Sequence, residues 1–361
     1  MYYGAQRAWI PFIMRTKAGR RGAQPHSHGN TFCCLTSIII SATWTWLATS
    51  LCAQTFTSFA VPECLSETPI SINGVGDITG TCESASGLNY GFLRAPDGTL
   101  RTFTVPEANV STQPVGINEA GVVAGVYGRE TTFTSHGFLR EPDGTIVSFD
   151  PPGSTYTAVL AINAAGTIIG WFSQDHSGAS TAFIRRNDGR FTLFSAGSLT
   201  IPIGINDDGV IVGSYVGGFF SRFADGSITT FSIDGCNNNC TLIGVSQALT
   251  IAGYTSNNNQ IGRSFVRMPD GTVTFFDAPG VGIHTGDGTF ATAINRTGDI
   301  VGSFSDSNNV FHGFLRRADG TIRDFSYPGA AWTVPNSLNA FDIVTGFFID
   351  PNSFTTEEST T

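Results

Sequence analysis

Four residues on variable connections have side chains suited to holding a ligand: Tyr156, His284, Asp287 and Trp332. The rings of Tyr156 and Trp332 could stack on a sugar or on an apolar partner surface. The imidazole and the carboxylate in segment 284–289 could hold a cation. The structural alternatives also stay open, namely rings that pack over a strand edge and a solvated turn at 284–289. We take the four as candidate ligand-binding residues and expect no metal and no cofactor.

Sequence motifs of catalysis are missing from the chain. It has no G-x-S-x-G elbow, no H-E-x-x-H pair and no phosphate-binding loop. A carboxylate pair of the glycosidase kind is not selected by any feature of the sequence. His136 and His312 occupy equivalent positions of an internal repeat, so we interpret them as part of the repeat pattern rather than as a catalytic pair.

One arginine is repeated three residues before the Asp of each Asp-Gly pair. The six copies are Arg94, Arg140, Arg185, Arg222, Arg267 and Arg316. They could ring an acidic ligand, but a residue repeated in every copy is more often structural. We expect these guanidinium groups to bond turn carbonyls or the nearby Asp.

Four cysteines lie beyond residue 53: Cys64, Cys82, Cys236 and Cys240. An even number favours disulfides and an oxidising compartment. We predict the pairs Cys64–Cys82 and Cys236–Cys240, because the first two lie nearly symmetrically about the turn 73–76. A zinc site is the alternative, and it lacks a second close Cys or His pair.

These residues must be positioned by an internal repeat of about 45 residues. Its clearest copies are Gly91–Tyr127, Gly137–Phe172 and Gly313–Phe348, each with four short apolar runs. A period of this length with four runs is typical of a β-propeller blade. We therefore predict an all-β fold, a β-propeller of about seven four-stranded blades, over residues 54–361 as a single domain.

Two kinds of turn punctuate each copy. An Asp-Gly pair joins the first two runs, and Asn-x-x-Gly joins the last two. In two copies the Gly is replaced, by Leu249 and by Asp342. In a meander both kinds of turn lie on one face, so the longer and more variable connections share the other face. We expect that second face to carry function.

The mature chain opens on the second strand of a blade, because residues 56–63 match residues 100–107. One first strand is then missing from seven blades. We expect the ring to close by pairing of terminal strands, with the missing strand supplied by Ser353–Thr356. An open β array is the alternative architecture.

The strings His136-Gly-Phe-Leu-Arg, Thr181-Ala-Phe-Ile-Arg and His312-Gly-Phe-Leu-Arg resemble the HAF family of extracellular repeat proteins. The resemblance covers nearly all of residues 56–350. It implies a secreted or surface-exposed protein of unknown activity, and it offers no catalytic residues.

Residues 1–53 have the order of a secretory signal peptide. A basic stretch, Arg15–Arg21, precedes an apolar run, Phe32–Leu51, with small residues for cleavage at Ala48 and Ser50 or at Ala53. The alternative is a retained membrane anchor, because the run is long enough to span a bilayer. We expect a secreted, extracellular or periplasmic protein.

Beyond residue 53 the chain has 14 arginines, no lysine and 28 acidic residues, so its net charge is 14 − 28 = −14. Such a surface repels phosphate backbones and anionic lipid, so we expect no nucleic acid partner and no membrane partner unless the anchor is retained.

We expect a monomeric, non-catalytic binding or interaction module for a carbohydrate or a protein. One alternative is a secreted carbohydrate-active enzyme, a glycoside hydrolase or lyase, with carboxylates near the central channel. The other is a purely structural cell-surface repeat.

Overall fold

The computed structural model describes residues 9–16, 54–129, 134–175, 180–236, 239–255 and 261–351. This part of the chain is all-β, with 28 strands. Within it, no helix is long and apolar enough to cross a bilayer.

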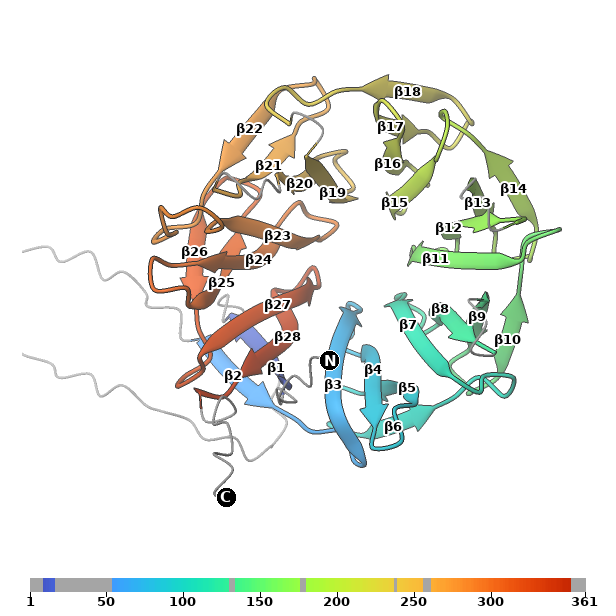
Figure 1. Cartoon of the computed structure of the whole chain (residues 1–361), viewed down its shortest axis with the longest axis horizontal. Helices are drawn as coiled ribbons and strands as arrows, with labels where there is room; N and C mark the ends of the chain where they lie inside the picture. Colours follow the sequence, from blue (N-terminus) through green and yellow to red (C-terminus); the bar gives the residue numbers. More distant parts are fainter. Residues whose placement is uncertain are drawn as a thin grey trace, which may run out of the picture.

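The strands form units of four around a central axis (Figure 1). The strands nearest the axis are β3 (Cys64–Ile72), β7 (Ser111–Ile117), β11 (Tyr156–Ile162), β15 (Ile201–Ile205), β19 (Cys240–Val245), β23 (Thr289–Ile294) and β27 (Trp332–Leu338). Their antiparallel neighbours are β4 (Ile78–Ser84), β8 (Val123–Gly128), β12 (Ile168–Ser173), β16 (Ile211–Tyr215), β20 (Ile251–Thr255), β24 (Ile300–Ser305) and β28 (Ile343–Ile349).

The third strands of the units are β5 (Asn89–Arg94), β9 (Ser135–Arg140), β13 (Thr181–Arg185), β17 (Gly218–Arg222), β21 (Ser264–Arg267), β25 (Phe311–Arg316) and β1 (Trp9–Thr16). The outer strands are β6 (Leu100–Phe103), β10 (Ile146–Phe149), β14 (Phe191–Phe194), β18 (Ile228–Phe231), β22 (Val273–Phe276), β26 (Ile322–Phe325) and β2 (Gln54–Ser58). We number the units by their inner strands, from the first (β3) to the seventh (β27).

The number of hydrogen-bonded sheets differs from the number of blades that the repeat predicts. The described strands form two eight-stranded and three four-stranded sheets. The larger sheets arise because single parallel residue pairs, Asn89 with Ser111 and Phe311 with Trp332, each join two units. The repeat therefore predicts the four-stranded unit correctly but does not predict these two bridges.

The predicted turns are present. In the Asp-Gly turns the glycine has positive φ, for example 93° at Gly98, and the Asp97 carboxylate accepts the Thr99 N–H at 2.8 Å. That hydrogen bond lowers the pKa of Asp97 below its ordinary value. The two altered turns keep the same backbone, because Leu249 and Asp342 both have a φ of 62°. A left-handed conformation at a non-glycine residue costs about 1–2 kcal/mol, so the repeat imposes its geometry on both.

The core lies between strands of one unit and between neighbouring units. A glycine in each second strand faces a phenylalanine of the third strand, as Gly125 faces Phe138, which is fully buried. Phe138 also meets Phe103 of the preceding unit edge-on, with ring centroids 6.1 Å apart. Two contacts therefore stabilise the fold: strands approach closely within a unit, and aromatic side chains pack between neighbouring units.

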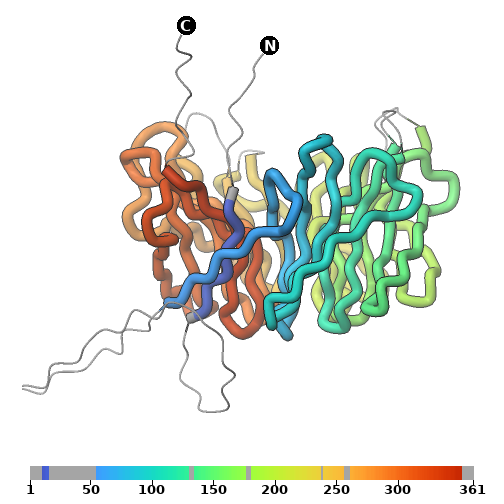
Figure 2. Tube along the Cα trace, turned by 90° about the horizontal axis from the view of Figure 1, so that it is seen from below, coloured from blue at the N-terminus to red at the C-terminus, as the bar shows by residue number. Residues whose placement is uncertain are grey.

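The prediction for the missing strand is corrected by β1. This strand pairs with β28 on one side and with β2 on the other, where a strand from Ser353–Thr356 was expected. Figure 2 shows β1 in dark blue beside the red strands that end the sequence. The residues Ser353–Thr356 lie outside the described residues. β1 falls within the segment 1–53 that the sequence predicts as a signal, and the apolar run of that segment also lies outside the description.

Candidate functional site

The two faces of the ring differ in how their polar groups are used. We call the face with the Asp-Gly and Asn-x-x-Gly turns the turn face, and the opposite one the loop face. The turns touch one another. Arg317 of an Asp-Gly connection bonds Asp342 at 2.9 Å and Asp299 at 3.3 Å, and these carboxylates raise its pKa.

On the turn face, asparagines of five units each bond the unit that follows. The Asn73 Oδ1 atom accepts the Asp77 N–H at 2.8 Å, and its Nδ2 donates to the Asn118 carbonyl at 3.1 Å. The same donation from Nδ2 recurs from Asn163 to Asn206, Asn206 to Ser246, Asn295 to Asn339, and Asn339 to Asn73. The last of these bonds joins the seventh unit to the first. We call these residues the asparagine ring. Their side-chain amides thus form hydrogen bonds that hold the units together.

The asparagine ring surrounds the mouth of the central channel, a cavity of about 180 Å³. Two carboxylates border it. Glu119 accepts the Gly74 N–H at 2.9 Å, and Asp207 accepts the Ala164 N–H at 3.1 Å. Both bond the backbone of an adjacent turn, so their geometry is that of turn-to-turn contacts.

Among the described carboxyl groups, Glu67 has its pKa raised by burial. It accepts the Val61 N–H at 3.3 Å and lines neither of the two cavities described here. Glu67 therefore lies apart from the two carboxylates at the channel mouth.

A larger hollow opens on the loop face, with a volume of about 590 Å³. It lies where β16 turns into β17 through Val216 and Gly217. The lining residues are Ser214, Tyr215, Val216, Gly217, Gly218, Phe219, Ser232, Ile233, Cys236 and Cys240. None of them is charged. The Cys236–Cys240 disulfide forms one wall of this Tyr215 hollow.

Tyr215 is a half-buried aromatic residue at a repeated position, two residues after the second-strand glycine. Four aromatic counterparts are buried: Tyr127 at 3% exposure, Phe172 at 1%, Phe304 at 3% and Phe348 at 7%. Three glycines frame the Tyr215 ring. A Cβ atom added to Gly197 would lie 2.6 Å from it, one on Gly217 3.5 Å and one on Gly218 3.8 Å. Side chains at these positions would cover the ring, so the glycines keep it open.

The predicted aromatic residues Tyr156 and Trp332 occupy equivalent places, each as the first residue of an inner strand. Tyr156 stacks on Trp171, with centroids 5.2 Å apart and planes at 23°. Trp332 packs on Phe311 at 4.9 Å. Both are half-buried on the loop face, in the third and seventh units, so the fold does not bring them together. Ligand binding by either ring stays a prediction.

His284 and Asp287 do lie together. The buried Asp287 carboxylate accepts the His284 N–H at 2.8 Å and lies 3.4 Å from its Nδ1 atom. It also contacts the Ser305 hydroxyl at 3.4 Å. No group of three or more metal-ligating side chains occurs among the described residues. In this geometry the carboxylate caps its own turn, while the His284 side chain is two-thirds exposed.

The two repeated histidines make cross-strand pairs. His136 Nδ1 lies 2.7 Å from Asp150, and His312 Nδ1 lies 2.8 Å from the equivalent Ser326. Arg263 and Asp277 fill the same two positions in the fifth unit. The two histidines therefore belong to a pair of positions that recurs in the repeat, as the sequence indicates.

The repeated arginines bond turn carbonyls, as predicted. Arg140 Nη1 donates to the Glu141 carbonyl at 3.2 Å, and the other five do the same one residue on. Each guanidinium also lies over an outer-strand phenylalanine of the preceding unit, as Arg140 lies 5.1 Å from the Phe103 centroid. The sequence did not predict this second contact, because the paired residues lie 28 to 40 positions apart in different copies of the repeat.

Both predicted disulfides are present, Cys64–Cys82 and Cys236–Cys240. The first is offset across its hairpin, because the residue paired with Cys82 is Glu67. A β-bulge between Cys64 and Ser66 brings the two Cα atoms to 5.5 Å.

No family model and no curated protein matches the chain. Solved structures do. A catalytically inactive variant of virginiamycin B lyase from Staphylococcus aureus, solved with quinupristin, has a TM-score of 0.53 at 14% identity, over 78% of this chain and 95% of that one. A streptogramin B lyase has a TM-score of 0.52 at 11% identity, over 81% and 96%.

An acylaminoacyl peptidase from Pyrococcus horikoshii has a TM-score of 0.51 at 11% identity, over 76% of this chain and 48% of that one. At such low identity these likenesses show the fold alone, which is that of β-propeller proteins. The four-stranded units are accordingly called blades below.

Proposed function

We propose that the protein is a secreted, seven-bladed β-propeller, closed by β1, that binds a neutral carbohydrate in the Tyr215 hollow without cleaving it. The observation that carries the proposal is the open Tyr215 ring, framed by glycines on the face where blades vary. Two disulfides support an oxidising compartment, since such bonds persist outside the reducing cytosol.

The chemistry of the hollow favours a sugar. A pyranose presents an apolar C–H face that stacks on an aromatic ring, and hydroxyl edges that need polar partners. Tyr215 and Phe219 provide rings, while Ser214 and Ser232 provide hydroxyl groups on the same wall. The volume of about 590 Å³ falls within the range of small-molecule sites, about 300–1,000 Å³.

Electrostatics narrows the class of carbohydrate. No charged side chain lines the hollow, and residues 54–361 have a net charge of −14. An acidic polysaccharide would be repelled at long range and would meet no cation inside. A neutral glycan meets neither penalty.

The test is a glycan array on the full chain and on five variants, of which Tyr156→Ala and Trp332→Ala probe the two other aromatic rings. Tyr215→Ala removes the stacking ring, and Ser232→Trp fills the hollow from an exposed position. Thr104→Trp is the matched control, because Thr104 is the exposed residue at the same place in the first blade. We expect Tyr215→Ala and Ser232→Trp to lose binding of neutral glycans and the control to keep it.

Each other outcome contradicts a part of the proposal. Binding that survives Ser232→Trp but is lost in Tyr156→Ala or Trp332→Ala would move the site to those rings. Release of reducing sugar from a bound glycan would refute the non-catalytic role. If the protein bound no glycan on the array but did bind a protein partner, the carbohydrate class would be refuted.

A further inference from the structure

The connection that follows β1 is much longer than the connections that follow its counterparts. In the second blade, for example, only five residues separate Arg140 at the end of β9 from Ile146 at the start of β10. In the seventh blade the same connection is residues 17–53. A tight turn sets the register of a hairpin, but a connection this long cannot. The register of β1 must therefore come from its own contacts.

The backbone of β1 pairs with a neighbouring strand on each of its two edges. Residues Trp9–Arg15 pair with β28, and Phe12–Thr16 pair with β2. The Thr345 hydroxyl donates to the Phe12 carbonyl at 3.2 Å, as the Thr79 hydroxyl does to the Phe92 carbonyl in the first blade. The gap between β28 and β2 is thus shaped for one extended strand.

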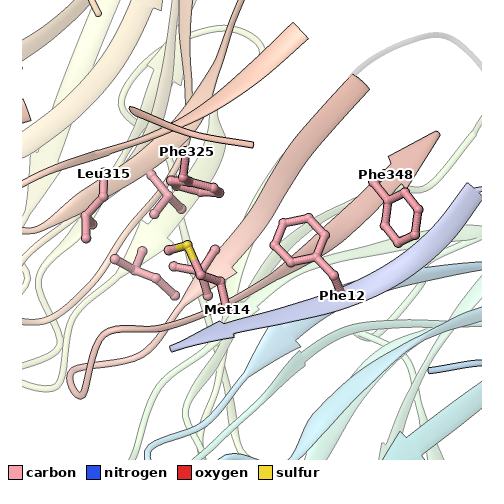
Figure 3. Close-up of a cluster of buried hydrophobic side chains, with 8 residues drawn as sticks. Phe12, Met14, Leu315, Phe325 and Phe348 are labelled. Atoms are coloured by element: carbon pink, nitrogen blue, oxygen red, sulfur yellow. The ribbon is translucent and has the colours of Figure 1, made fainter. Parts of the chain in front are cut away.

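The side chains of β1 supply specificity. Phe12 and Met14 are fully buried in a cluster with Leu315, Phe325 and Phe348 (Figure 3). Phe12 also lies 5.8 Å from the Phe56 ring and 6.3 Å from Tyr327.

The next side chain faces the other way. Ile13 is 6% exposed and packs with Ile72, Ile78 and Phe92 of the first blade. One short segment therefore contacts the sixth, seventh and first blades.

Met14 also departs from the repeat in a way that suits an apolar ligand. It stands where the other six blades place the repeated arginine, and it shares its cluster with Phe325. Phe325 is the counterpart of Phe276, over which Arg316 lies at 4.9 Å. Arg15, the charged residue of β1, is exposed.

We propose that the gap between β28 and β2 is a strand-binding site for an extended apolar peptide, and that β1 occupies it as a peptide on a long tether. The ligand is the pattern Phe-Ile-Met of residues 12–14 in extended form, supplied by the chain's own segment 9–16. The mode is β-strand addition, in which main-chain hydrogen bonds provide affinity and pockets for alternate side chains provide specificity.

The experiment cuts the tether in the folded full-length protein. A recognition sequence for a site-specific protease is inserted after residue 25, the protein is cut, and gel filtration with mass spectrometry follows the amino-terminal fragment. We expect the fragment to co-elute with the propeller. A fluorescent peptide of residues 9–16 in excess should then displace it, with a rise in anisotropy.

Peptide variants test the specificity. Phe12→Ala should weaken peptide binding by about 100-fold or more, because the ring is fully buried. Arg15→Ala is the control and should bind within about threefold, because this side chain is exposed. Release of the fragment on cutting would overturn the proposal, as would equal binding of the Phe12→Ala peptide.

Discussion

The substitution Gly125→Ala tests the close approach of strands within a blade. A Cβ atom at Gly125 would press into the Gln113 carbonyl oxygen and lie 2.6 Å from Phe138 Cε1, where carbon atoms normally stay about 3.5–4.0 Å apart. β8 would have to retreat from β7 by about 1 Å. Overpacking of this kind costs about 1–3 kcal/mol. Weakening one or two ladder hydrogen bonds adds about 0.5–1.5 kcal/mol each.

We therefore expect Gly125→Ala to lower the free energy of unfolding by about 2–6 kcal/mol. For a domain of about 300 residues, this corresponds to a fall of about 3–10 °C in the melting temperature. Gly128→Ala on the same strand is the control. Its added methyl would lie 3.3 Å from Ser111 Oγ and 3.6 Å from Val110 Cβ. This variant should melt within about 2 °C of the parent. Scanning calorimetry at one scan rate measures both, and a Gly125→Ala variant that melts like the control would refute the reasoning.

Three further predictions concern stability. Burial raises the pKa of Glu67, so folding favours the protonated carboxyl group. The free energy of unfolding therefore falls as pH rises through the pKa of the folded state. Glu67→Gln should raise the melting temperature at pH 7, and raise it less at pH 4. Replacing Cys64 and Cys82 together by Ser should cost about 3 kcal/mol in a denaturant titration, and equal midpoints would contradict it. Asn339→Ala removes the bond to Asn73 and the cap of its own turn, so we expect a loss of about 2–3 kcal/mol in the same titration, with no loss refuting a role in joining the ends of the ring.

Much of the blade could be predicted from the sequence because its signals are local. Asp-Gly and Asn-x-x-Gly fix turns within four residues, and the turns at Leu249 and Asp342 persist where glycine is missing. The contacts between blades could not be predicted in the same way. The asparagine that caps its own turn also bonds a carbonyl about 45 residues on, and no spacing within one repeat shows that.

The β1 strand was missed for a related reason. Its pattern matches the first run of a repeat at Phe12, but Met14 replaces the arginine that marks the other six copies. The basic and apolar residues that follow favoured a signal instead. The pairing with β28 depends on a contact across more than 300 residues.

The sequence predicts the candidate site on the long connections and on the large aromatic residues that they carry. At the Tyr215 hollow the connection from β16 to β17 is short, and the aromatic ring that four other blades bury is left half-buried. One feature of the sequence does indicate the hollow. Gly217 and Gly218 follow an aromatic residue at a position where the other blades carry a longer connection.

The pairing of β1 with β28 also constrains how the protein folds. β1 is synthesised more than 300 residues before its partner strand, because Phe12 pairs with Gly346. Contacts between residues so distant in sequence slow folding, since the loop between them must be closed before they stabilise anything. A nascent chain would thus carry an apolar strand without its site until β28 has been synthesised. We expect the seventh blade to form last, and refolding to show a slow phase that the peptide of residues 9–16 accelerates when the chain's own strand is disabled by Phe12→Ala.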